Sequence, residues 1–176
     1  MVQRVSLREF QRHLTERLGS AQRGESSRSL LGVETGSGAD SHWLLDLADS
    51  GEVSPLSGGL TPTPLTKPWF AGIANIRGTL YSVVDFSAFR GGEPTPQNAE
   101  ARLLLIGARH GSNSALLVNR TLGLKPPALF AEPTADDTPA GELWRGAVVT
   151  DAQGLRWTRL VIPQLLADPR FMDVAA

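Results

Sequence analysis

Three histidines, His13, His42 and His110, are the side chains of this sequence best suited to acid–base chemistry or to metal binding. An imidazole titrates near neutral pH and is a common metal ligand. None of the three has a histidine four residues away, and no H-E-x-x-H motif surrounds any of them. We therefore expect no metal site, and histidines that are exposed or satisfied by hydrogen bonds.

Residues that could serve as nucleophiles or bind phosphate are also missing or wrongly placed. The sequence has no cysteine, which excludes disulfides, thiolate catalysis and cysteine-ligated zinc. The G-S-G-A-D segment at 36–40 is not a G-x-S-x-G nucleophile elbow, and no phosphate-binding G-x-x-x-x-G-K-[ST] loop is present. Asp136 and Asp137 lie in a Pro/Thr/Ala-rich stretch that predicts a solvated loop. We expect a protein that is not an enzyme and binds no cofactor.

Composition and charge limit the partners. The 176 residues are 41% hydrophobic and 20% charged, which is enough for one domain or two small subdomains. The net charge of −1 does not favour nucleic acid, and no basic strip follows residue 30. Four tryptophans could stack on bases, but their apolar neighbours predict core or barrel-edge positions: Trp43, Trp69, Trp144 and Trp157. We expect no nucleic-acid partner.

The apolar segments are too short to enter a membrane. The longest runs, 103–106 and 115–118, are far below the roughly 20 residues that a spanning helix needs. The first residues lack the continuous apolar stretch of a signal peptide. We expect a cytoplasmic protein without direct membrane insertion.

An amphipathic helix is predicted over residues 6–19. Its apolar side chains recur at helical spacing: Leu7, Phe10, Leu14 and Leu18. Ser6 and Glu9 form a capping-box pattern, and residues 20–29 have the composition of a polar linker. Up to residue 28 the segment holds six arginines against three acids. This arm, residues 1–28, is interpreted either as a solvated helix or as a segment that binds a partner.

The remainder is predicted to be mainly β, with many short strands. Alternating or short apolar runs predict strands near 30–34, 42–48, 52–56, 72–77, 79–85, 102–108, 114–119, 143–149 and 155–161. Gly-, Pro- and Asn-containing turns separate them, and residues 163–172 suit a short C-terminal helix. Short strands with short connections favour barrels or a sandwich over a parallel α/β sheet.

The stretch W-F-A-G-I-A-N-I-R-G-T-L-Y-S-V-V-D-F at 69–86 predicts a hairpin with a charged corner. Gly78 can adopt the positive φ of a tight turn between strands at 73–76 and 80–84. Arg77 would then leave the core. Two interpretations remain open: Arg77 pairs with an acid such as Asp85 or Glu52, or it contacts a partner.

These residues carry a resemblance to the CheW-like chemotaxis coupling family. The family shows a G-x-x-N-[LI]-R-G run followed by an apolar strand and V-[VI]-D-[LF], as in 72–78 and 83–86 here. Segments R-L-L-L-I at 102–106, A-L-L-V-N-R at 115–120 and W-R-G-A-V at 144–148 fall in the family's order, although Asn119 stands where aspartate is usual. The similarity covers about residues 30–167. The W-F-A-G-I-A-N-I-R-G and L-Y-S-V-V-D-F details, with the arm, are similar to the PilI-like branch of type IV pilus chemosensory systems.

The resemblance implies an all-β fold of two small SH3-like five-stranded barrels packed side by side, with an N-terminal and a short C-terminal helix. It divides the chain into the arm, 1–28, and a CheW-like domain, 29–172. It also implies a non-catalytic adaptor in two-component signal transduction, cytoplasmic and recruited to membrane receptor arrays. The implied partners are the regulatory domain of a CheA-like histidine kinase and the cytoplasmic tip of a methyl-accepting chemoreceptor.

The pathway implied by the PilI-like branch is twitching motility driven by type IV pili. The implied protein-binding residues are Arg77, Glu52, Gly72, Val84, Leu103 and Val118. Two alternatives remain: a coupling protein of a flagellar chemotaxis system, and an unrecognised small-barrel ligand-binding module or enzyme.

Overall fold

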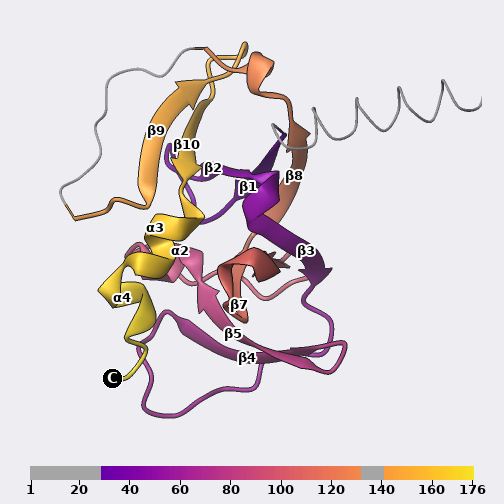
Figure 1. The fold of residues 1–176 in the computed structure, drawn as a ribbon, viewed down its shortest axis with the longest axis vertical. Coiled ribbons are helices and arrows are strands. Elements are labelled where there is room, and N and C mark those ends of the chain that lie inside the picture. Colours follow the sequence, from indigo (N-terminus) through magenta and orange to yellow (C-terminus); the bar gives the residue numbers. More distant parts are fainter. Residues whose placement is uncertain (1–28, 132–140) are drawn as a thin grey trace, which may run out of the picture.

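A computed structural model describes residues 29–131 and 141–176 (Figure 1). In these residues ten strands form two five-stranded sheets. The strands are β1 (Leu30–Glu34), β2 (His42–Asp46), β3 (Ser50–Pro55), β4 (Phe70–Ile76), β5 (Thr79–Asp85), β6 (Arg102–Ile106), β7 (Ser114–Val118), β8 (Arg120–Lys125), β9 (Arg145–Thr150) and β10 (Arg156–Leu160). The short helices are α2 (Phe86–Phe89), α3 (Ile162–Ala167) and α4 (Pro169–Met172), with 3-10 turns at Leu47–Asp49, Ala108–His110 and Pro127–Leu129.

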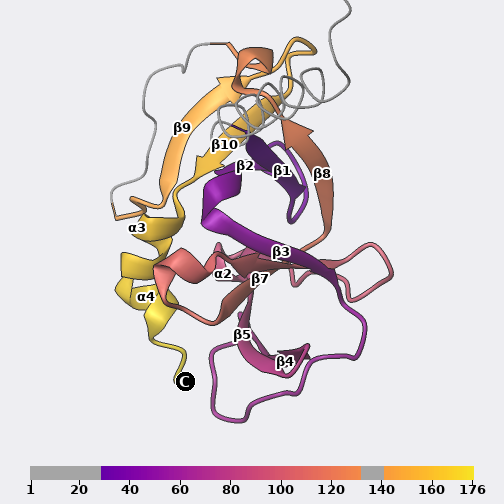
Figure 2. The same ribbon diagram turned by 45° about the vertical axis from the view of Figure 1, so that its right-hand side comes forward.

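The two sheets take their strands from different parts of the chain. One, in the order β8-β1-β2-β10-β9, combines the first two and the last three strands, and we call it the terminal barrel. The other, in the order β3-β6-β7-β5-β4, is formed from the middle of the chain, and we call it the central barrel. Each has one parallel pair among antiparallel neighbours, β2 with β10 and β5 with β7. Figures 1 and 2 show the terminal barrel above the central one, with the three helices beside their junction.

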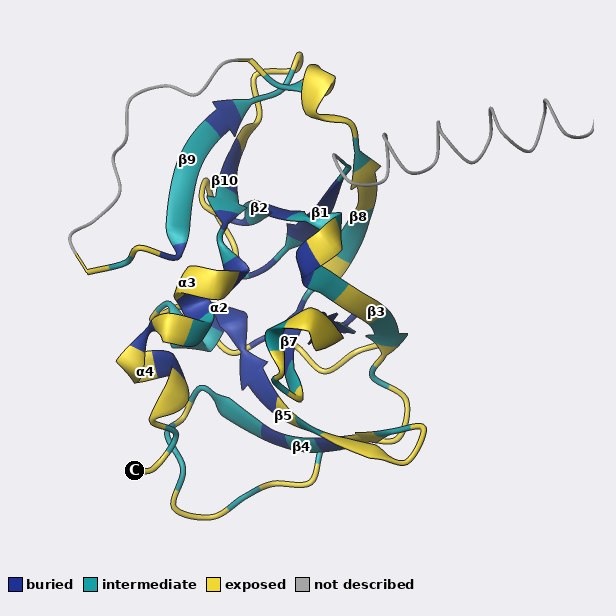
Figure 3. Ribbon diagram, in the orientation of Figure 1, coloured by how far each residue is buried: buried dark blue, intermediate teal, exposed yellow. Residues whose placement is uncertain are grey.

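Residues on both faces of several strands are buried, because the barrels pack against each other. In β6, Leu103 and Leu105 face the interior of the central barrel, whereas Leu104 and Ile106 join the cluster between the barrels. The same cluster takes Val33 and other residues of β1 and β2 from the terminal barrel. Figure 3 shows buried residues concentrated around this junction. Continuous apolar runs in these strands therefore reflect burial on two sides.

Aromatic rings fill the space where the helices meet both barrels. Trp43 of β2 lies edge-on to Phe86 of α2, with ring centroids 5.1 Å apart. Trp144 lies 5.9 Å from Trp43, and Phe89 of α2 packs edge-on against Phe171 of α4 at 5.5 Å. Because these residues come from both barrels and from the C-terminal segment, the junction is one continuous core.

The predicted mainly β fold with two five-stranded sheets is confirmed, and the differences are local. Strand β8 was not predicted, because Gly123, at φ 79°, interrupts the apolar pattern of 120–125 and accompanies a bulge against β1. The predicted helix 163–172 is divided at Asp168, which is extended and caps α4. The predicted helix 6–19 lies outside the described residues.

Candidate protein-binding site

The corner of the β4–β5 hairpin is a two-residue turn made by Arg77 and Gly78. Ile76 pairs with Thr79, and the two residues between them have φ values of 51° and 86°. Two positive φ values are typical of a type I′ turn, whose twist matches that of the flanking strands. The side-chain oxygen of Asn75 accepts a hydrogen bond of 2.9 Å from the Gly78 amide. The predicted turn is confirmed, and its geometry projects Arg77 away from the core.

Arg77 pairs with Glu52 of β3. The guanidinium Nη2 lies 2.9 Å from the Glu52 carboxylate, and the two side chains are 79% and 38% exposed. An ion pair this exposed contributes only about 0–1 kcal/mol to stability, because water already solvates both charges. The Arg77 side chain therefore remains available to a partner while Glu52 holds its orientation.

Asp85, the other acid considered for Arg77, has a structural role. It is buried and caps α2, accepting from the amides of Ser87 at 3.1 Å and Ala88 at 3.2 Å. It also accepts from the amide and hydroxyl of Thr95, at 2.6 and 2.8 Å. These bonds explain why a carboxylate lies in an apolar stretch, and they leave Glu52 as the partner of Arg77.

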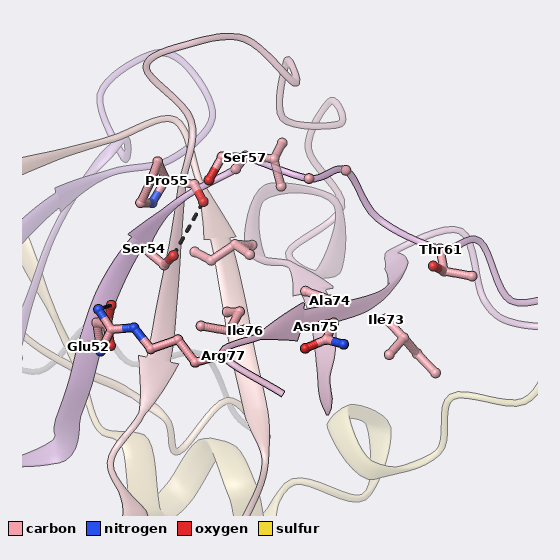
Figure 4. A pocket seen from close by; sticks show the side chains of 14 residues that line it. Glu52, Ser54, Pro55, Ser57, Thr61, Ile73, Ala74, Asn75, Ile76 and Arg77 are labelled. Atoms are coloured by element: carbon pink, nitrogen blue, oxygen red, sulfur yellow. Dashed lines mark hydrogen bonds and ion pairs between the residues drawn. The ribbon is translucent and has the colours of Figure 1, made fainter. Parts of the chain in front are cut away.

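A groove of about 430 Å³ begins at this ion pair (Figure 4). Strands β3 and β4 are the two ends of the central sheet, so the groove lies where backbone pairing does not close the barrel. Its lining combines the charged pair with apolar and amide side chains: Glu52, Ser54, Pro55, Leu56, Thr61, Ile73, Ala74, Asn75, Ile76, Arg77 and Leu103, with residues 57–59. A concave surface whose exposed lining is mostly polar, with some apolar side chains and a charged end, suits a protein segment carrying both apolar and polar groups.

Gly72 lies beside two residues of the groove lining, Thr61 and Ile73. Its φ is 123°, and a Cβ at this position would lie 2.4 Å from the carbonyl oxygen of Thr61. Thr61 and Ile73 exchange two backbone hydrogen bonds of 2.9 Å, which fasten the loop to β4. Gly72 is buried, so it shapes the groove through the backbone.

The C-terminal residues fasten the same loop at a second point. The Lys67 amide donates to the carbonyl of Val174 at 2.9 Å, and the Ala176 amide donates to the carbonyl of Leu65 at 3.0 Å. The Lys67 ammonium lies 3.0 Å from the carboxylate of Asp173. The loop between β3 and β4 is thus attached to β4 at one point and to the C-terminal tail at another.

The structure brings together half of the residues that the sequence indicated for binding. Glu52 and Arg77 line the groove with exposed side chains, and Leu103 also lines it but is buried in the interior of the central barrel. Val84 and Val118 are buried in the core between the barrels, so their side chains can affect binding only through packing. Of the lining residues that sequence reasoning missed, Ile73 and Ile76 lie in the signature stretch, but no sequence signal marks β3 and β4 as the open edges.

Two of the histidines considered for chemistry, His110 and His42, are instead held by a hydrogen bond and by ring packing. His110 Nε2 lies 2.7 Å from the buried carboxylate of Asp49, which also pairs with Arg109. The ring of His42 packs edge-on against Trp157, with centroids 5.1 Å apart. Among residues 29–131 and 141–176, no three or more His, Cys, Asp or Glu side chains are grouped to hold a metal ion. His13 and the Asp136–Asp137 pair lie outside the described residues.

The tryptophans are core residues, as predicted, and the indole N–H groups of the three buried ones donate hydrogen bonds. Trp43, Trp144 and Trp157 are buried, while Trp69 is partly buried against the core between the barrels. Trp144 donates to Asp168 at 3.0 Å, and Trp157 donates to Asp151 at 2.9 Å. Within the described part of the chain, no helix is long and apolar enough to cross a bilayer.

Comparisons with known proteins agree with this geometry. The model of the CheW-like domain matches residues 37–168, which include the whole central barrel, the groove and every strand of the terminal barrel except β1. Among solved structures, the scaffolding protein TtCheW from Thermoanaerobacter tengcongensis superposes with a TM-score of 0.60 at 17% identity, covering 76% of this chain and 88% of that one. No curated protein sequence matches significantly. Since the matched region spans most of the chain, this protein belongs to the CheW-like domain family.

Proposed function

We propose that this protein is a non-catalytic adaptor that couples the cytoplasmic tip of a methyl-accepting chemoreceptor to a CheA-like histidine kinase. The observation that carries the proposal is the groove at the open edge of the central barrel, with Arg77 and Glu52 at its end, in a chain of the CheW-like family. A similar protein of known structure is described as a scaffolding protein. In this role the chain acts in the cytoplasm at membrane receptor arrays.

The proposed contact uses Arg77 as its charged anchor. A guanidinium presents several N–H donors in a plane, so it can hold Glu52 and still donate to a carboxylate or carbonyl of a partner. Ile73 and Ile76, which are partly exposed, offer apolar surface beside it. Signalling contacts of this kind are often small, under about 1,200 Å². Repeated contacts within an array would supply avidity that one groove lacks.

Charge reversal tests the assignment of the groove. We expect Arg77→Glu to reduce capture of the kinase regulatory domain or the receptor tip by tenfold or more. The substitution removes the guanidinium that the partner is expected to contact and places a second carboxylate beside Glu52. The melting temperature should change little, because the Arg77–Glu52 pair is exposed. A matched control is Arg156→Glu, an exposed arginine on β10 of the terminal barrel. If Arg77→Glu binds both partners as the parent protein does, the groove is not the contact surface.

The pathway proposed is control of type IV pilus twitching motility. Support comes from the W-F-A-G-I-A-N-I-R-G and L-Y-S-V-V-D-F segments, which are similar to the PilI-like branch. Deletion of the gene in its host should abolish twitching zones and leave swimming rings intact. The opposite pattern would assign the protein to a flagellar chemotaxis system.

A ligand-binding module or enzyme is the remaining alternative. Such a protein should show a thermal shift with a small molecule, or turnover by the purified chain. The adaptor proposal expects neither, together with co-purification of a kinase and a receptor.

A further inference from the structure

The open edge of strand β4 carries backbone groups that are not paired with another strand. Ile73 exchanges two hydrogen bonds of 2.9 Å with Thr61, so its N–H and C=O face the loop and not β5. Ser82 lies opposite Ile73 on β5, and its amide donates to the Asn113 carbonyl, which agrees with a pair that is not hydrogen bonded. Successive residues of a strand direct their backbone groups to alternate edges, so those of Asn75, two residues after Ile73, also point to the open edge.

Asn75 lines the groove with its backbone groups accessible. It is exposed and lies on β4 between Ile73 and Arg77 (Figure 4). Its side-chain oxygen is occupied by the Gly78 amide. Within residues 29–131 and 141–176, no segment hydrogen bonds to its N–H or C=O. Free N–H and C=O groups at the edge of a sheet are a template for a further strand.

The loop before Thr61 leaves the edge of β4 at the level of Asn75. If the antiparallel bridge continued, Gly59, two residues before Thr61, would lie opposite Asn75. Gly58 and Gly59 instead have φ values of 112° and 74°, which turn the chain aside, and both line the groove. The loop therefore leaves the Asn75 backbone open to one residue of another segment.

Strand β3, across the groove, is less suited to pairing. It ends at Pro55, which lacks an amide hydrogen, and a register shift interrupts its pairing with β6 between Ser50 and Val53. Proline and bulges on an edge strand discourage the addition of another strand. Residues 73–76 of β4 contain no proline and pair regularly with β5. Of the two edges that border the groove, β4 is thus the one suited to strand addition.

The charge at the end of the groove sets a second requirement for its occupant. Among the residues that line the groove, only Glu52 and Arg77 are charged, and Arg77 is the more exposed, at 79% against 38%. A guanidinium has five N–H donors, more than one carboxylate can accept. A segment paired with Asn75 brings a residue two positions along, roughly 7 Å away, level with Arg77. A carboxylate at that position would complement the cation.

We propose that a protein partner docks in the groove by strand addition: one residue of an extended, acidic segment exchanges two backbone hydrogen bonds with Asn75, and a carboxylate of the same segment binds Arg77. The backbone bonds give affinity and fix the register, and the carboxylate gives selectivity. A partner surface that is only helical cannot make this contact, because the backbone groups of a helix are bonded within the helix. The inference rests on the proposed function, since it assigns how the adaptor holds a partner in the same groove.

Paired variants at position 75 test the backbone contact. Asn75→Pro removes the amide hydrogen and Asn75→Ala keeps it, while both remove the side-chain bond to Gly78. The probes are the purified kinase regulatory domain and the purified receptor tip, each added separately to the full chain. For the probe whose capture depends on Arg77, we expect Asn75→Ala to bind within about threefold of the parent protein and Asn75→Pro to bind about tenfold or more weakly. Protection of the Thr61 and Ile73 amides in both variants shows that the edge of β4 is intact.

Hydrogen exchange in the parent protein gives a readout that needs no variant. Saturation with the same probe should slow exchange of the Asn75 amide by about tenfold or more, because that amide becomes hydrogen bonded. The Ile73 amide, which already donates to Thr61, should change little.

The outcomes separate this inference from the proposed function. Suppose that Arg77→Glu reduces capture, yet Asn75→Pro binds like Asn75→Ala and the Asn75 amide exchanges at its free rate. The groove is then the contact surface, but strand addition is overturned. If Arg77→Glu changes the capture of neither probe, the proposed use of the groove is wrong, and strand addition fails with it.

Discussion

Replacement of Gly72 by alanine should separate the shape of the groove from the chemistry of its lining. Two costs arise at this position. A residue with a side chain is strained at φ 123°, by about 1–3 kcal/mol. Its Cβ would also lie 2.4 Å from the Thr61 carbonyl oxygen, so the loop must move and its two hydrogen bonds with Ile73 weaken. At about 0.5–1.5 kcal/mol for each bond, the total is about 2–6 kcal/mol.

Gly58 provides a matched control for this experiment. Its φ of 112° is similar, but nothing lies within 4 Å of a Cβ built there. Gly58→Ala should therefore show only the conformational cost. For a chain of this size, 1 kcal/mol corresponds to about 2–4 °C in melting temperature. We expect Gly72→Ala to melt several degrees below Gly58→Ala by calorimetry, and hydrogen exchange to show faster exchange of the Thr61 and Ile73 amides. Equal melting temperatures for the two variants would refute the reasoning, because the Thr61 contact would then cost nothing.

Three further predictions concern the contacts that hold the fold around the site. Asp85→Ala should destabilise the protein by about 3 kcal/mol or more in urea denaturation, because it leaves buried donors of α2 and Thr95 without an acceptor; an unchanged midpoint would contradict the capping role. The pKa of Asp168 is lowered, chiefly by the hydrogen bond from Arg170, so its contribution to stability is present above pH 3.8 and is lost as the pH falls below that value. Asp168→Asn should therefore flatten the acid side of the stability profile, and an identical acid limb would count against this linkage. Deletion of residues 173–176 should speed exchange of the Lys67 amide without changing that of β6 amides, and equal protection of Lys67 would show that the tail does not hold the loop.

The sequence predicted the hairpin corner because its signals are local. Gly78 after Arg77, between two β-branched runs, specifies a turn with positive φ, and a turn forms from neighbouring residues alone. The role of Asp85 could not be predicted in the same way. Two of its donors belong to Thr95, ten residues further along the chain, and that contact depends on how the intervening segment folds. Likewise, Glu52 and Asp85 were equivalent candidates for Arg77 until the structure placed Glu52 on the strand across the groove.

The positions of the strands could be predicted from local sequence patterns, but the burial of both faces of a strand could not. The runs at 103–106 and 115–118 indicated buried strands, yet only the packing of the barrels shows which side chains face the interior and which face the other barrel. Val84, Leu103 and Val118 illustrate the consequence. They lie on three neighbouring strands of one sheet and all three are buried, but Leu103 faces the interior of the central barrel beside the groove, whereas the two valines face the core between the barrels.

The amino-acid sequence by itself determined the β-rich fold, the charged hairpin corner and the resemblance that identifies the family, because alternation, turn residues and short motifs act over a few neighbouring positions. Tertiary structure alone decided that β3 and β4 are the open edges of a barrel, that Glu52 lies beside Arg77, and that the C-terminal tail fastens the loop between them. These features join residues from 25 to more than 100 positions apart. Such contacts are selected by the packing of the whole chain, which no local pattern records.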